Sequence, residues 1–463
     1  MKGNNKYASL AYTIKIEDIT ANKINRGILH RIKGNDPTLI EIEIRKSETN
    51  YDSVVEYKND IDYIVEDGED IGWLGYFIGQ NTKLQNITYF KPINDESFNE
   101  EILHNKSIKQ TKLWGKTFQS SELFFKNNHN LVEISVEYCG VFTADDVRYF
   151  SLALECCSKS LKRITLCDNT IDDHGLVDII TALSIHPQLE VLELSYSDIG
   201  RIEVEALSNL LLHTTQLKTL NLQGNYIDDE MVECLVTNAL SNINQLQELN
   251  VGDNEIGPVG LQIFASALVN NCSLKTLLLS VDDGAANDHI VDIEQISCHF
   301  KGLLCDTSSV NNIYLSNHTL ECLGDDLGPD VVVVPDDVQC YLDLNSGSED
   351  KGGIAMSKIL RHYSHFNMQP FFEWELKALP LMISWFDKAS TSTSEFEEKI
   401  VKMKLSATFD FIKEFPMLYI EPILRQEIAE YSAMEMLLQG SKMQHTSILK
   451  EILQCKTRAL RRF

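Results

Sequence analysis

Two short patterns carry residues that could bind phosphate or a metal ion. Trp114-Gly115-Lys116-Thr117 holds the Gly-Lys-Thr of a phosphate-binding loop, but the first glycine of that motif should lie five residues before Gly115, where this chain has Gln110. Without that glycine, the backbone cradle for phosphate lacks its flexible start. His362 and His365 stand three residues apart, with neither the glutamate nor the third ligand of a zinc site. Neither pattern therefore predicts a nucleotide or metal site.

Acidic side chains form two further groups. The first lies in an insertion after Leu279 and contains Asp282, Asp283, Asp288, Asp292 and Glu294, through which no alternating calcium-binding loop can be written. The second contains Asp60, Asp62, Glu66, Asp67, Glu69 and Asp70. We interpret both as solvated loops, although an insertion can also be a contact site. The spacing assembles no Ser/His/Asp or Cys/His group, so we expect no enzymatic activity, no metal and no cofactor.

Charge and cysteine content narrow the class of protein. The 463-residue chain has a formal net charge of −27, which argues against nucleic acid as a ligand, because Lys and Arg carry the affinity for phosphate backbones. The same charge permits a basic protein partner. No apolar run has the length of a signal peptide or a membrane span, and the eleven cysteines are odd in number, without metal or redox spacing. We therefore expect a soluble cytoplasmic protein that binds neither membrane nor nucleic acid.

The chain is repetitive. The pattern Leu-x-x-Leu-x-Leu begins at Leu161, Leu189, Leu217, Leu246 and Leu274, so that successive copies start 28 or 29 residues apart. The same register extends backwards to a copy at Leu131 and to degenerate copies at Ile108, Leu84 and Leu39, and forwards to a copy at Val310. A polar turn such as QNTK, HNKS or NNCS precedes many of these starts. A fixed period of this length indicates a solenoid of about ten units.

Each unit combines a strand with a helix. The alternation Leu220-Asn221-Leu222 has period two, as in a strand with one buried face. About twelve positions later the apolar period changes to 3.6, in helices that a glycine such as Gly175 or Gly260 begins or precedes. Because a helix is wider than a strand, stacked units should form a curved parallel sheet on the inside with helices outside.

The repeat pattern resembles the ribonuclease-inhibitor class of leucine-rich repeats, strongly from Leu131 to about Ser280 and weakly from about residue 36 to 325. The resemblance implies an α/β leucine-rich-repeat solenoid. The family position held by Asn or Cys is filled here by Cys139, Asn169, Ser197, Asn225 and Asn254. These side chains are predicted to form a structural ladder that satisfies backbone groups of neighbouring turns.

Composition suggests four regions. We expect an N-terminal segment or cap at 1–35, the repeat horseshoe at 36–325, a linker at 326–353 and an all-α C-terminal module at 354–463 that could seal the open end of the sheet. The linker assignment rests on Gly-, Pro- and Asp-rich turns, and the module on helical spacing with aromatic residues.

Side chains that alternate with the buried leucines should point into the concave face. Counted from the first leucine of each unit, these are positions three, five, seven and eight. The predicted partner-binding residues at these positions are Glu133, Glu137, Tyr138, Arg163, Asp168, Glu193, Tyr196, Asn221, Gln223, Asn250 and Asp253. This surface is mostly acidic, with Tyr138 and Tyr196 as aromatic anchors and Arg163 as its lone cation.

These features favour a non-enzymatic interaction scaffold that binds a protein partner, a basic one in particular, on the acidic concave face. Two alternatives remain open. The resemblance implies that the chain could instead regulate a small GTPase, because some activators of Ran-type GTPases are built from such repeats. It could also be a recognition component of a sensing or defence pathway. A fold alone does not select among these functions.

Overall fold

The structure is a computed structural model that describes residues 6–46, 60–66, 70–90, 95–115, 130–157, 159–240, 245–279, 293–324, 334–348 and 350–363. The chain divides into two compact units, one of Met1–Tyr363 with Asp387–Ile400 and one of Ser364–Phe386 with Val401–Phe463. Every described residue belongs to the first unit. The predicted C-terminal module lies outside the described residues beyond residue 363.

An eleven-stranded sheet runs through the described part of the chain, and all its strand pairs are parallel. Its strands, in sequence order, are β1 (Glu41–Lys46), β2 (Asp62–Val65), β3 (Asn86–Phe90), β4 (Gln110–Trp114), β5 (Glu133–Glu137), β7 (Arg163–Thr165), β9 (Val191–Glu193), β10 (Thr219–Asn221), β11 (Glu248–Asn250), β12 (Thr276–Leu278) and β13 (Cys322–Gly324). Beside it, β6 (Gly140–Val141) pairs with β8 (Asn169–Thr170). Except for β2, which pairs at the edge beside β1, spatial order follows chain order, as a solenoid requires.

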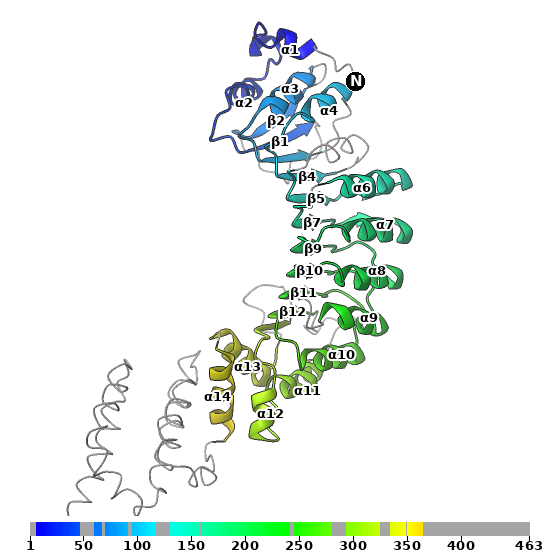
Figure 1. Ribbon diagram of the computed structural model, residues 1–463, viewed down its shortest axis with the longest axis vertical. Helices are drawn as coiled ribbons and strands as arrows, with labels where there is room; N and C mark the ends of the chain where they lie inside the picture. Colours follow the sequence, from blue (N-terminus) through cyan, green and yellow to red (C-terminus); the bar gives the residue numbers. More distant parts are fainter. Residues whose placement is uncertain are drawn as a thin grey trace, which may run out of the picture. The chain divides into compact units, whose positions relative to one another are not determined.

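One helix follows each strand of the regular repeats. These helices are α6 (Ala144–Cys156), α7 (Asp173–Leu183), α8 (Arg201–Leu211), α9 (Asp229–Ala239) and α10 (Pro258–Leu268), with α11 (Ile293–Leu304) beyond them. They stack side by side along one side of the sheet (Figure 1). Gly175 and Gly260 permit this close stacking, because a Cβ at Gly175 would lie 2.7 Å from a methyl of Val147, and one at Gly260 would lie 2.6 Å from Asp229 Oδ1.

The repeat leucines form the core between the sheet and the helices. In the unit that begins at Leu217, the side chain of Leu217 is 2% exposed, and those of Leu220 and Leu222 are 0% exposed. Burying one such side chain contributes about 1.5 to 3 kcal/mol. The regular leucine period therefore determines which face of each short strand lies inward.

Polar turns hold successive strands at their N-terminal ends. The Asn105 side chain donates to the carbonyls of Ile78 and Asn81, at 2.6 and 3.0 Å, and accepts from the backbone N–H groups of Ser107 and Ile108. Three further buried asparagines make contacts of this kind, namely Asn81, Asn271 and Asn317. The recurring polar turn in the sequence therefore forms a second hydrogen-bonded series, separate from the ladder predicted at the strand ends.

The N-terminal elements are α1 (Lys6–Leu10), the 3-10 helix η1 (Ile16–Asp18), α2 (Lys23–Lys33), α3 (Gly72–Gln80) and α4 (Glu96–Ile102). Here one prediction is wrong, because Asp62 does not lie in a solvated loop. It lies in β2, is 1% exposed and pairs with Arg45, whose Nε is 3.3 Å from Asp62 Oδ1. The surrounding acidic residues concealed the apolar strand signal of Tyr63-Ile64-Val65.

The last repeat also differs from the prediction. The segment that begins at Val310 is a helix, α12 (Val310–Leu315), which Ser309 caps by accepting from Asn312 N–H. The strand β13 comes later, after the polar turn at Asn317. The expected linker contains a helix, α13 (Asp336–Ser346), and α14 (Lys351–His362) crosses residue 354. The four region boundaries themselves stay predictions.

Candidate functional site

The sheet face opposite α6 to α10 presents side chains in columns and is called the open face below. Ser135, Thr165, Glu193, Asn221 and Asn250 occupy the position-five column of β5, β7, β9, β10 and β11 and are direct neighbours in the strand register. Position three forms a second column in the same strands, consisting of Glu133, Arg163, Val191, Thr219 and Glu248. The parallel register therefore brings residues about 30 positions apart in the sequence into contact.

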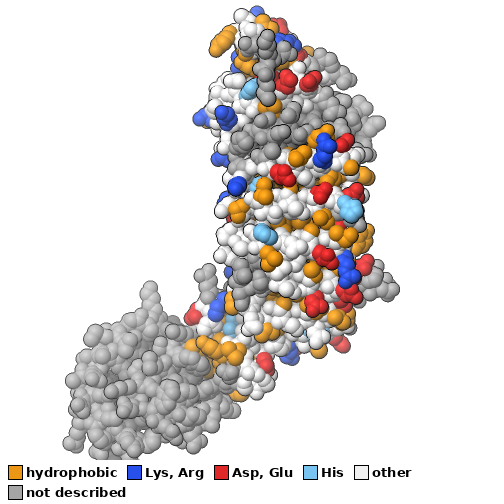
Figure 2. Space-filling view, turned by 45° about the vertical axis from the view of Figure 1, so that its right-hand side comes forward, with side chains coloured by type: hydrophobic (Ala, Val, Ile, Leu, Met, Phe, Trp, Pro, Cys, Tyr) orange, Lys and Arg blue, Asp and Glu red, His pale blue; other side chains and the backbone are white. Residues whose placement is uncertain are grey.

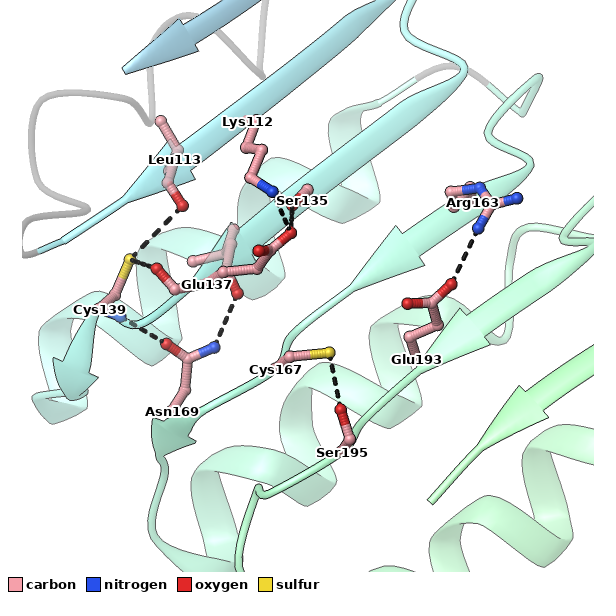
Figure 3. Close-up of polar contacts among 11 residues, drawn as sticks. Lys112, Leu113, Ser135, Glu137, Cys139, Arg163, Cys167, Asn169, Glu193 and Ser195 are labelled. Carbon is pink, nitrogen blue, oxygen red and sulfur yellow. Dashed lines mark hydrogen bonds and ion pairs between the residues drawn. The ribbon is translucent and has the colours of Figure 1, made fainter. Parts of the chain in front are cut away.

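Ion pairs connect the acidic residues of the open face. Arg163 Nη1 lies 2.8 Å from Glu193 Oε1 (Figure 3). Arg163 Nε also lies 4.0 Å from Glu133 Oε2. Lys112, on β4, lies 2.8 Å from Glu137 Oε1, which also accepts a hydrogen bond from Ser135 (Figure 3). Arg163 is thus not the lone cation of this face, because the weak repeat at Ile108 contributes Lys112.

A stack of aromatic rings lies on the open face at β3, β4 and β5, in the early repeats of the chain. Phe90 and Trp114 are register neighbours on β3 and β4, with centroids 5.6 Å apart and planes 30° apart. Tyr138 continues the stack on Trp114, at 5.2 Å and 19°. The Arg45 guanidinium lies 3.8 Å from the Phe90 ring centroid, a favourable cation–π distance. Sequence reasoning found Tyr138 but missed Phe90 and Trp114, although both occupy position seven of degenerate repeats.

The residues at position eight all adopt left-handed backbone conformations. Their φ values are 54° at Tyr138, 55° at Asp168, 53° at Tyr196, 67° at Gly224 and 51° at Asp253. A non-glycine residue in this region is uncommon, and a bulky one is a clear outlier. The Tyr196 hydroxyl donates to Asp253 Oδ2 at 3.0 Å, and the Tyr196 ring covers Gly224, where an added Cβ would lie 2.2 Å from the ring.

The amide side chains that the open face presents on and after β10 and β11 form hydrogen bonds with the backbone and with neighbouring side chains. Asn221 and Asn250 each accept from the backbone N–H two residues ahead, at 3.0 Å. Gln223 donates to Asp253 Oδ2 at 2.9 Å and accepts from Asn250 at 3.3 Å. Asn250 is 9% exposed. These contacts give Asn221 and Asn250 a structural task in addition to the binding role predicted for them.

The predicted ladder residues lie buried, directly after position eight. Asn169 accepts from the Cys139 N–H and donates to the Val136 carbonyl, at 2.9 and 2.8 Å (Figure 3). Asn225 accepts from the N–H groups of Ser197 and Ile199. Ser197 donates to the Leu166 carbonyl at 2.7 Å, and Asn254 donates to the Leu222 carbonyl at 2.9 Å.

Burial raises the pKa of the Cys139 thiol, a member of this series, to about 12, which disfavours the reactive thiolate form. Burial also raises the pKa of Cys167, which accepts a hydrogen bond from Ser195 at 3.0 Å (Figure 3).

The Gly-Lys-Thr pattern, the histidine pair and the acidic insertion contribute little to the open face. Gly115 has a φ of 77°, and Lys116 and Thr117 lie outside the described residues. His362 Nε2 lies 2.6 Å from the Tyr341 hydroxyl, whereas His365 and residues 280–292 of the acidic insertion are not described. Within the described ranges no three His, Cys, Asp or Glu side chains are placed to hold a metal ion. A search of the same ranges found no helix of membrane-spanning length and apolarity.

The stacked strand–helix units and the Leu-x-x-Leu-x-Leu pattern define the class: the chain is a leucine-rich-repeat protein with an α/β solenoid fold. No family model matches it. It is 31% identical over 179 residues to the human protein named NACHT, LRR and PYD domains-containing protein 14, and 30% identical over 187 residues to the mouse protein of that name. These matches take in 32% and 39% of this chain.

The chain spans only 16% and 18% of the lengths of these two relatives, whose names record leucine-rich repeats. Among solved structures, an internalin from Listeria monocytogenes is 13% identical with a TM-score of 0.29, covering 60% of this chain and 96% of that one. A TM-score this low does not support any assignment of fold or function.

Proposed function

We propose that this protein is a non-enzymatic scaffold that binds a protein partner on the open face of its repeat sheet. The observation that carries the proposal is the exposed aromatic stack, because Trp114 and Tyr138 remain 36% and 52% exposed although their rings are ordered against each other. Ordered, exposed aromatic residues are the usual anchors of protein interfaces. Tyr196, 47% exposed, offers a second anchor two strands away.

Charge favours a basic partner. At positions three, five, seven and eight, the strands from β4 to β11 carry two cations, Lys112 and Arg163, against six carboxylates, namely Glu133, Glu137, Asp168, Glu193, Glu248 and Asp253. Both cations are already paired with carboxylates of the face. The residual charge is negative, and it would attract a positive surface and repel a negative one. On the helix-bearing side, acidic, basic and apolar side chains are interspersed (Figure 2).

A sensing or defence setting is consistent with the NACHT, LRR and PYD domains-containing relatives. In such a setting, we propose that the repeats recognise the protein partner through the same open face. The odd cysteine count supports a cytoplasmic location. Neither the relatives nor the described residues favour the GTPase-regulator alternative, which stays a prediction of the sequence.

Quantitative affinity capture from cell extract tests the proposal. The test variant combines Thr219→Arg with Glu133→Lys and Glu193→Lys, which adds bulk and reverses charge on the open face without changing the tyrosines. The matched control carries Glu205→Lys and Glu233→Lys, on exposed positions of α8 and α9. We expect the open-face variant to lose specific partners that the control and the wild type retain, at equal melting temperature. Retention of every partner by the folded open-face variant would refute the proposal.

A further inference from the structure

Tyr138, Asp168, Tyr196, Gly224 and Asp253 form a continuous edge, called the rim here, at the C-terminal ends of β5, β7, β9, β10 and β11. Hydrogen bonds of the backbone join each rim residue to the next repeat. Tyr138 N–H donates to Cys167, Asp168 to Ser195, Tyr196 to Gln223 and Gly224 to Gly252, at 2.8 to 3.2 Å. The rim therefore keeps the strand spacing of about 4.8 Å from one residue to the next.

The rim tyrosines occupy positions that disfavour tyrosine. Glycine reaches a positive φ without penalty, as at Gly224 and at Gly115 in the preceding repeat. Tyr138 and Tyr196 adopt the same conformation with bulky side chains, which strains the backbone at both residues. Strain of this kind concentrates at functional sites, and here it leaves two large rings half-exposed.

Each tyrosine neighbours one rim carboxylate: Asp168 lies one strand step from Tyr138, and Asp253 accepts a hydrogen bond from the Tyr196 hydroxyl. Tyr138 packs on Trp114 of β4 and Tyr196 packs over Gly224, so each ring rests on the side away from β7. Asp168 follows β7, the strand between β5 and β9. The charge of Asp168 raises the pKa of the Tyr138 phenol. The rim residues and their position-seven neighbours, Glu137, Cys167, Ser195, Gln223 and Gly252, include no lysine or arginine.

We propose that the rim binds the cationic side chains of an extended basic segment of the partner. One guanidinium or ammonium group lies above Asp168 beside the Tyr138 ring, and a second lies above Asp253 beside the Tyr196 ring, whose hydroxyl already contacts that carboxylate. A carboxylate beneath a cation and an aromatic ring beside it act together, because the ring face is the negative end of its quadrupole. This assignment rests on the proposed function and names the chemistry by which the same face recognises its partner.

Strand spacing fixes the separation of the two cations. Asp168 and Asp253 lie three strand steps apart, across β7, β9, β10 and β11, which is about 14 Å. An extended peptide advances about 3.4 Å per residue, so arginines four residues apart fit both carboxylates. Arginines two residues apart reach only about half that distance.

Titration of the full-length protein with three fluorescent peptides by anisotropy, at about 0.1 M salt, tests this inference. The peptides share a Gly/Ser frame and carry two arginines four residues apart, two arginines two residues apart, or two citrullines four residues apart. Citrulline keeps the shape of arginine but lacks its charge. We expect the four-residue spacing to bind at least tenfold more tightly than either other peptide.

Rim variants then locate the binding. Asp168→Asn, which tolerates a positive φ, and Tyr138→Ala with Tyr196→Ala should each weaken the four-spaced arginine peptide about tenfold. The matched controls are Glu205→Gln, on α8, and Tyr226→Ala, an exposed tyrosine outside the rim, and both should bind as the wild type does. Melting curves confirm that each variant is folded.

Equal losses in rim and control variants, or equal binding of the citrulline or two-spaced peptide, would overturn the rim assignment. Its failure is distinguishable from failure of the proposed function. If capture from extract depends on the open face while arginine peptides ignore the rim, the scaffold stands and the rim assignment falls. If the arginine peptides require the rim but capture from extract does not depend on the open face, the rim binds cations and the scaffold proposal falls.

Discussion

Asn225 and Ser197 bind two neighbouring repeats together: Asn225 Oδ1 accepts the Ser197 N–H at 3.0 Å, and its amide donates to the Leu194 carbonyl, also at 3.0 Å. Both contacts are buried. Asn225 therefore supplies partners for backbone groups that a short strand leaves without any.

Asn225→Ala should lower stability without changing recognition. The substitution leaves buried backbone groups of Ser197, Ile199 and Leu194 without partners, at about 1 to 3 kcal/mol for each unsatisfied group. We expect a lower melting temperature and unchanged affinity per folded molecule for the partner. An unchanged melting temperature would show that Asn225 is not a structural rung.

Gly224→Ala tests the packing beneath Tyr196. The new Cβ would lie 2.2 Å from the Tyr196 ring and would sit at a φ of 67°. The ring must move and the backbone is strained, so we expect a loss of about 1 to 3 kcal/mol in the free energy of unfolding. Gly302→Ala is the control, because a Cβ there meets nothing within 4 Å in helix α11. Chemical denaturation should show the loss at Gly224 alone.

The buried pair Arg45 and Asp62 gives a third prediction. Asp62 is 1% exposed and Arg45 8% exposed, so Arg45→Ala leaves a buried carboxylate without its guanidinium, at about 3 to 5 kcal/mol. The same substitution removes the cation over Phe90. Replacing both residues, as Arg45→Met with Asp62→Leu, should recover part of that loss, because the double variant still removes the ion pair of Arg45 with the part-buried Glu43. A double variant no more stable than Arg45→Ala, by chemical denaturation, would contradict this account.

The regular part of the fold was predictable because one period fixes it. Five copies of Leu-x-x-Leu-x-Leu at 28 or 29 residues determine the strands, their register and the inward leucines. The predicted open-face residues from Glu133 to Asp253 follow directly, because alternation along a strand determines the face.

The rest depended on weak repeats and on contacts between distant residues. Phe90 and Trp114 occupy position seven of units that carry only part of the leucine pattern, and the outward-facing residues are predicted only for the regular units from Leu131 onward. The segment at Val310 resembles a strand by its apolar spacing and forms α12 instead, because six residues do not separate period two from a helical turn. The pairing of Asp62 with Arg45 requires β2 to align at the sheet edge, which local sequence does not specify.

The buried amine of Lys358 gives a pH-dependent prediction. Its Nζ donates to the carbonyls of Leu304 and Asn317, at 2.7 and 3.1 Å, and contacts His318 Nδ1 at 3.2 Å. Burial lowers the pKa of Lys358 from 10.5 to about 7. Between these two pKa values the unfolded chain binds more protons at this site than the folded chain, so the Lys358 contribution to stability rises with pH over that window.

The comparison of wild type with Lys358→Met isolates this contribution from the other groups that titrate nearby, including Cys305, Cys340 and Tyr341. Measured by chemical denaturation at pH 7, 8 and 9, the free energy of unfolding of wild type relative to the variant should rise by up to about 1.4 kcal/mol per pH unit. Below pH 7 the amine is protonated in both states and the slope vanishes. A difference independent of pH between 7 and 9 would mean that Lys358 keeps an ordinary pKa in the folded protein and that its burial is relieved by water.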